Sequence, residues 1–100
     1  MNLDSSDIAL ILEALNRFIE TANLEFSSTA IQRKRNEDVA HSCKKKITEK
    51  ANNMSRDECR IIWSSLSFLH LETEEYLSND PVRERILSRL ENLMDFFDPE

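Results

Sequence analysis

The sequence contains no glycine and only two prolines, Pro81 and Pro99. Sheet proteins use glycine in tight hairpin turns, because those turns need backbone angles that other residues adopt only at a cost. A chain without glycine therefore argues against a β-sandwich or barrel, and it lacks the glycine-rich loop that cradles phosphates in nucleotide-binding proteins. Leucine, glutamate, lysine, arginine, alanine and isoleucine are abundant, and most of them are good helix formers. The composition predicts an all-α fold.

Long apolar runs are also missing, since no stretch approaches the roughly 18–20 residues that cross a bilayer. The N-terminus, Met1-Asn2-Leu3-Asp4, shows neither the basic region nor the cleavage-site pattern of a secretory signal. Two cysteines do not make a disulfide framework. We therefore expect a cytoplasmic protein with reduced thiols and no membrane partner.

The net charge of −6 is unevenly distributed along the chain. Residues 1–30 carry one basic side chain against five acidic ones, and residues 61–100 carry three against nine. Residues 31–60 reverse this balance, with nine basic side chains against five acidic ones. A mostly acidic surface would repel phosphate, which argues against a general nucleic-acid-binding protein.

Apolar residues recur at three- and four-residue spacing in four stretches, and each stretch predicts an amphipathic helix. The first predicted helix spans about 5–26. Each helix follows a residue that suits the N-cap position. These residues are Asp4 (with Asp7), Thr29 (with Gln32), Ser55 (with Glu58) and Asp80, which precedes Pro81. The segment 32–38 has no apolar side chain and fits either a solvated helix start or a loop.

The two halves of the chain resemble each other. A shift of 51 residues places Asp4 on Ser55 and Asp7 on Glu58, and a shift of 47 aligns the second helix with the fourth. A single hairpin cannot bury both faces of its helices, so two stacked copies are the expected solution. The sequence therefore predicts one domain over 1–100, a four-helix antiparallel bundle of tandem hairpins spanning 3–52 and 54–97.

One segment offers a catalytic alternative. Arg35, Asn36 and His41 follow the spacing R-x5-H, which resembles the R-x(4–6)-H motif of the HEPN ribonuclease superfamily. The resemblance implies a dimeric ribonuclease in which Arg35 and His41 form the catalytic pair and Asn36 supports them. Histidine can transfer a proton near neutral pH, and arginine can stabilise a charged phosphate transition state.

A basic strip lies in the same region. It comprises Arg33, Lys34, Arg35, Lys44, Lys45 and Lys46. These side chains fit a solvated face that pairs with the acidic helices, and they also fit a nucleic-acid-binding regulator.

The histidines and cysteines do not indicate a metal site. His41, Cys43, Cys59 and His70 lack the paired C-x2-C or H-x3-H spacing that structural zinc sites usually show. Both cysteines fall on core positions, where a free thiol behaves as a small apolar group. We expect neither a metal nor a cofactor.

The third predicted helix, which begins after Ser55, carries apolar residues on two sides. Its core stripe includes Cys59, Ile62, Trp63, Leu66 and Leu69. Other apolar residues fall away from the core stripes of their helices and form a candidate interface: Leu10, Ile61, Phe68 and Leu71. A helix that is apolar on two sides is either central in a bundle or binds a partner.

The leading interpretation is therefore a small non-enzymatic protein that acts by protein–protein interaction, as a regulatory, inhibitor or immunity-type module of the kind that phages and mobile elements encode. Its partner would be another protein or a second copy in a homodimer. The alternatives are the HEPN-like ribonuclease and the nucleic-acid-binding regulator.

Overall fold

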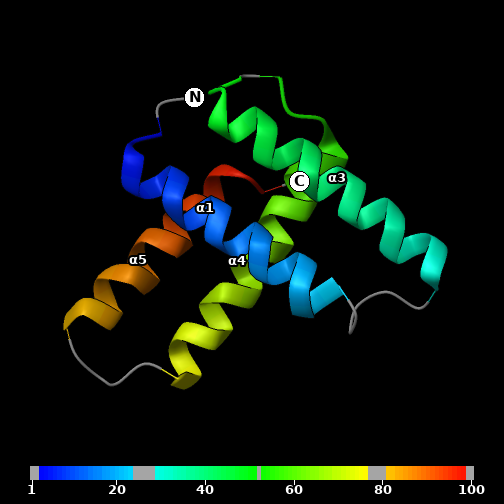
Figure 1. Cartoon of the computed structure of the whole chain (residues 1–100). Coiled ribbons are helices and arrows are strands. Elements are labelled where there is room, and N and C mark those ends of the chain that lie inside the picture. Colours follow the sequence, from blue (N-terminus) through cyan, green and yellow to red (C-terminus); the bar gives the residue numbers. More distant parts are fainter. Residues whose placement is uncertain (1–2, 24–28, 52, 77–80, 99–100) are drawn as a thin grey trace.

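A computed structural model describes residues 3–23, 29–51, 53–76 and 81–98 (Figure 1). Every regular element within these ranges is helical, which confirms the predicted all-α fold. The elements are α1 (Ser5–Arg17), the π-helical segment η1 (Phe18–Ala22), α3 (Ala30–Thr48), α4 (Arg56–Tyr76) and α5 (Pro81–Phe96). No helix in the described ranges combines the length and apolar character that crossing a bilayer requires.

Local capping bonds explain where the helices begin. The Asp4 carboxylate accepts from the backbone N–H of Asp7 at 2.8 Å, and Thr29 Oγ1 accepts from the N–H of Gln32 at 3.0 Å. Before α4, Ser55 Oγ accepts from the N–H of Glu58 while the Glu58 carboxylate accepts from the N–H of Ser55. These three predicted starts are confirmed, whereas Asp80 lies outside the described residues.

The end of α3 shows how a chain without glycine closes a helix. Lys50 adopts a left-handed backbone with φ of 57°, and its N–H donates to the carbonyl of Ile47. The N–H of Ala51 donates to the carbonyl of Lys46 at 2.9 Å. This pair of bonds is a Schellman motif, in which glycine usually occupies the left-handed position. Lysine takes that position here at a conformational cost.

The structure answers one question that the sequence left open and departs from the predicted helices at one segment. Residues 32–38, which fit helix or loop, are helical and belong to α3. The first predicted helix continues beyond Arg17 as the π-helical η1. A π-turn holds more residues than an α-turn, so it changes which side chains face inward. Phe18 and Ala22 continue the buried spacing of α1, and Asn23, which follows the π-turn, is buried beside them.

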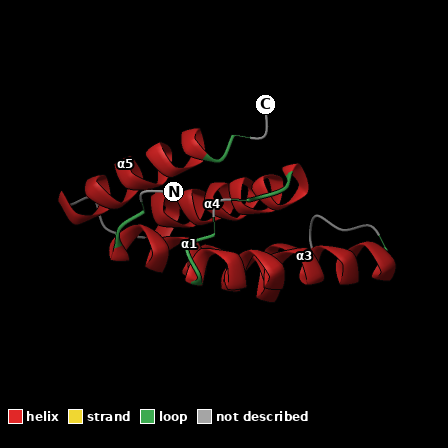
Figure 2. Ribbon diagram, turned by 90° about the horizontal axis from the view of Figure 1, so that it is seen from above, coloured by secondary structure: helices red, strands yellow, loops and turns green. Residues whose placement is uncertain are grey.

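The helices form a two-layered bundle. Figure 2 shows α1 and α3 on one side and α4 and α5 on the other, and Figure 1 shows that the two pairs cross. Each pair runs antiparallel, so each half of the described chain is a helical hairpin. Helix α4 is central, since it packs against α1, α3 and α5. The predicted helical bundle is thus observed, while the internal repeat stays a prediction.

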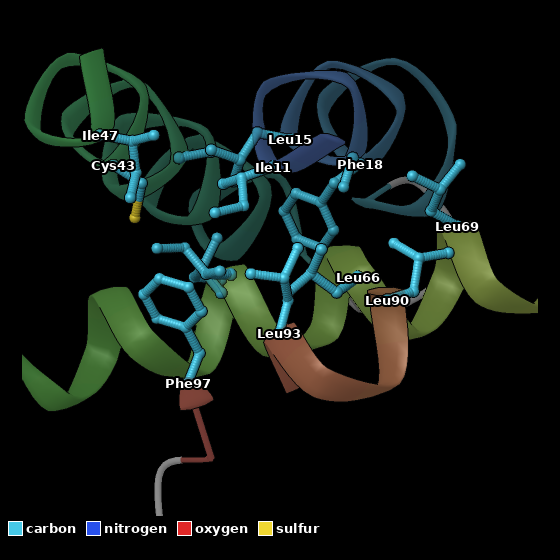
Figure 3. Close-up of a cluster of buried hydrophobic side chains, with 14 of the residues drawn as sticks. Ile11, Leu15, Phe18, Cys43, Ile47, Leu66, Leu69, Leu90, Leu93 and Phe97 are labelled. Carbon is cyan, nitrogen blue, oxygen red and sulfur yellow. The ribbon is translucent and has the colours of Figure 1, made fainter. Parts of the chain in front are cut away.

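The hydrophobic core lies between these layers (Figure 3). One layer contributes Phe18, and the facing layer contributes Leu66. Cys43 is fully buried in this core, as its place in the apolar stripe predicts. The labelled core residues are Ile11, Leu15, Phe18, Cys43, Ile47, Leu66, Leu69, Leu90, Leu93 and Phe97.

Candidate interaction groove on helix α4

The sequence pattern predicts which side of α4 faces the hydrophobic core, and this prediction is wrong at two positions. Ile61, expected on the opposite side, is only 6% exposed and belongs to the core. Trp63, expected in the core, is only half-buried. Ile61 is buried because α4 is central, and packing against three helices buries a wider arc than the single stripe of an edge helix.

A groove lies along α4 where α3 and η1 pack against it. Its volume is about 460 Å³. We call it the α4 groove. It is lined by Phe18 of η1, Gln32 and Asn36 of α3, and Arg60, Ile61, Trp63, Ser64, Ser67, Phe68 and Leu71 of α4.

Three of the four residues predicted as an interface line this groove together. Ile61 forms part of its inner wall, Phe68 is half-buried, and Leu71 is 53% exposed. Leu10 does not join them, because it lines a separate groove with Leu69 and Ile86 between α1, α4 and α5. The structure thus divides the predicted surface into two places.

Sequence reasoning missed the rest of the lining. On α4 a signal exists, since Arg60, Ser64, Ser67 and Leu71 recur at helical spacing and so share one side of the helix. The sequence pattern places Trp63 in the core stripe of α4 and so predicts no place for it in the groove. Gln32 and Asn36 carry no such signal, because only the packing of α3 on α4 brings them to the groove.

A buried amide pair supports the α3 wall of the groove. Asn23, only 1% exposed, follows η1 and donates from Nδ2 to the backbone carbonyl of Arg33 at 3.0 Å. Its Oδ1 accepts from Asn36 Nδ2 at 3.1 Å. The π-turn positions Asn23 for these bonds, and π-turns occur frequently beside functional sites. The groove wall is thereby fixed to the end of the first helix.

An ion pair fixes α3 to α4 near the other end of their contact. Lys46 Nζ lies 2.7 Å from Glu58 Oε1 and also donates to the carbonyl of Asn53. Ser42 Oγ donates to the other carboxylate oxygen at 2.9 Å. Burial acts to raise the pKa of Glu58, but hydrogen bonds from Lys46, the Ser55 N–H and Ser42 outweigh it and lower the pKa to about 2. The carboxylate is therefore ionised at neutral pH.

The residues of the predicted basic strip do not share one environment. Lys46 is committed to Glu58, and Lys34 pairs with Asp38 on its own helix at 3.0 Å. Arg35 and Lys45 are exposed, while Arg33 and Lys44 are partly buried. The strip is thus a mixture of structural and solvated cations along α3.

The residues of the HEPN-like motif all lie on α3. Arg35 and His41 are exposed, and six residues of α-helix place them about 120° apart around the axis. Asn36, the expected supporting residue, is hydrogen-bonded to Asn23 and lines the groove.

The candidate metal ligands are dispersed. His70 contacts Glu74 at 3.0 Å through Nδ1 and Glu91 at 3.2 Å through Nε2, which joins α4 to α5. Burial raises the pKa of the Cys43 thiol to about 12, so this thiol stays protonated. Within the residues that the structure describes, no three His, Cys, Asp or Glu side chains gather as a metal site would require.

Comparison with known proteins gives no relative from which a function could be inferred. Compared with protein-family models, with curated proteins and with solved structures, the chain matches none of them. The lining of the α4 groove, its exposure and its charge are therefore the observations from which a function is inferred.

Proposed function

We propose that this protein is a small non-enzymatic regulatory or inhibitory module that binds another protein through the α4 groove. The observation that carries the proposal is the group of apolar side chains that line that groove, of which Leu71 is exposed and Trp63 and Phe68 are partly buried. Leu71 is more than half exposed, and the aromatic rings of Trp63 and Phe68 line the same hollow. Exposed apolar patches on soluble proteins frequently mark interaction sites.

The residue types support binding rather than chemistry. Tryptophan and arginine are enriched among residues that dominate binding energy, and Trp63 and Arg60 lie in the groove together. The groove is lined mainly by one helix and bordered by another, which is the kind of surface that accepts a partner's helix. Its walls are held by the Lys46–Glu58 ion pair and the Asn23–Asn36 bond, so little ordering is needed on binding.

The experiment is a comparative capture followed by reconstitution. Wild-type protein and a Leu71→Asp variant serve as bait in a lysate of the cells that make the protein. A protein retained only by wild type is then purified and titrated against both forms by calorimetry. We expect Leu71→Asp to weaken binding by roughly 100-fold, because it places a charge in the apolar contact.

A second variant serves as the matched control. Val82 is exposed on α5 to nearly the same extent as Leu71, and it lies outside the α4 groove. Val82→Asp should bind as wild type does. Equal binding by the wild-type and Leu71→Asp proteins, or equal loss in both variants, would show that the α4 groove is not the contact.

A further inference from the structure

We infer that the occupant of the α4 groove is an amphipathic α-helix of another protein, with carboxylates beside its apolar face. This inference rests on the proposed function and specifies the partner. It combines three observations on the groove: its charge, the size of its side chains, and the way in which its backbone is already paired.

The groove differs in charge from the chain as a whole. The chain carries 19 acidic against 13 basic side chains, yet the ten residues that line the groove include one arginine and no carboxylate. Arg60 lies 3.6 Å from Asp57, and both side chains are exposed, so the pair is weak and Arg60 can exchange Asp57 for a carboxylate of the partner. At the other end of the groove the exposed Glu75 follows Leu71 by one helical turn. Glu58 is committed to Lys46.

Further arginines lie close to the groove. Arg56 precedes Arg60 by one helical turn, and Arg35 lies between the groove residues Gln32 and Asn36 on α3. Both are exposed. An acidic partner would therefore meet complementary charge at the entrance of the groove, which favours fast and selective association.

The side chains along the groove leave room for a helix. Ser64 and Ser67 are small and lie between the larger Trp63, Phe68 and Leu71. Small residues between large ones allow the side-chain ridge of a second helix to approach closely. The apolar residues then provide contacts for anchors on the incoming helix at three- and four-residue spacing.

Backbone pairing favours a helix over an extended segment. The N–H and C=O groups within α3 and α4 are already bonded inside these helices, so the groove offers no edge to a strand. A bound helix brings its own backbone groups already paired. A symmetric second copy fits less well, because an isologous contact would bring the Arg60 side chains of both copies to the same interface.

The test uses a phage-displayed library of helical peptides. Every member has apolar residues at positions i, i+3 or i+4, and i+7, and the flanking positions carry Glu, Lys or Gln. The library is selected on wild-type protein and counter-selected on Leu71→Asp, with both proteins verified as folded by circular dichroism. We expect Glu to be enriched over Lys at the flanking positions.

Charge reversal gives the sharper readout. Arg60→Glu should weaken the selected acidic peptide roughly tenfold, and a version of the peptide with Lys in place of Glu should regain affinity for that variant. Arg85→Glu changes the charge by the same amount on α5, outside the α4 groove, and should bind the acidic peptide as wild type does.

The outcomes separate the inference from the proposed function. Selected peptides that depend on Leu71 but carry Lys at the flanking positions, or that bind Arg60→Glu as tightly as wild type, would contradict the acidic partner. In either case the groove would remain a binding site. If no peptide depends on Leu71, both proposals fail. A wild-type dimer that Leu71→Asp converts into a folded monomer would identify a second copy as the occupant and overturn the inference.

Discussion

The ammonium group of Lys46 lies 2.7 Å from the carboxylate of Glu58 and joins the last turn of α3 to the first turn of α4. Glu58 is also the reciprocal partner of Ser55 in the cap of α4. One buried carboxylate therefore starts a helix and fixes its position against a neighbour. Both helices border the α4 groove, so the geometry of the groove depends on this pair.

Replacing Glu58 with glutamine should destabilise the fold by about 2–3 kcal/mol. The change keeps a capping acceptor but leaves the Lys46 ammonium, whose side chain is mostly buried, without its counter-charge. Urea unfolding followed by circular dichroism measures the difference. The control is Asp57→Asn on the same turn, which is exposed and should change the unfolding free energy by about 0.5 kcal/mol or less.

Acid should remove the same stabilisation. The pKa of Glu58 is about 2 in the folded protein against an ordinary value of 4.5. A lowered folded pKa stabilises the protein above the unfolded pKa, and the stabilisation is lost as pH falls from about 5 towards 2. Glu58 should contribute about 3 kcal/mol to that loss. The Asp4 pKa is also lowered, chiefly by the Asp7 N–H, and adds to the loss in the same direction.

Unfolding free energies measured from pH 6 to pH 2.5 test this dependence. The profile of Glu58→Gln should be flatter than that of wild type, because the variant has no carboxyl group to titrate at this position. Parallel profiles for the two proteins would show that Glu58 is not the group responsible.

Replacing Lys50 with glycine should stabilise the protein by about 1 kcal/mol. Lys50 has a φ of 57°, where a Cβ atom is unfavourable and glycine is not. The hydrogen bonds of the Schellman motif use backbone atoms only, so the substitution keeps them. Thermal unfolding measures the gain. A glycine at the neighbouring Glu49, which has an ordinary right-handed backbone, should not stabilise the protein.

The two apolar residues Ile61 and Leu71 should respond differently to the same substitution. Ile61→Asp places a charge at a core position and should cost at least about 3 kcal/mol. Leu71→Asp changes an exposed position and should cost about 0.5 kcal/mol or less. Chemical denaturation compares them. Similar costs would mean that the two residues do not differ in burial as the structure shows.

The helix starts could be predicted from the sequence, because capping bonds link residues only three positions apart. Asp4, Thr29 and Ser55 each signal their helix locally. The helical state of residues 32–38 could not be predicted, since no apolar pattern marks it. There the helix is supported by a tertiary bond, from Asn36 to Asn23.

The candidate site was predictable only in part. Apolar spacing placed Phe68 and Leu71 on the outer side of α4, where they line the groove. The same spacing predicted that Trp63 is buried in the core and that Ile61 is not, whereas Ile61 is buried and Trp63 is partly exposed. Periodicity shows which residues share a face of a helix, but it does not show how many neighbouring helices cover that face. The π-turn of η1 and its buried Asn23 have no recognised pattern in the sequence.

The central claim is that the protein binds a partner helix in the α4 groove, and Trp63 provides the most direct measurement. It is the single tryptophan of the chain, and it lines the groove. An acidic helical peptide without tryptophan, chosen by the display selection, is titrated into wild-type protein while Trp63 emission is recorded. The account predicts a shift to shorter wavelength that saturates at one peptide per chain, because the helix excludes water from the indole. Binding detected by calorimetry with unchanged Trp63 emission would place the partner elsewhere and contradict the account.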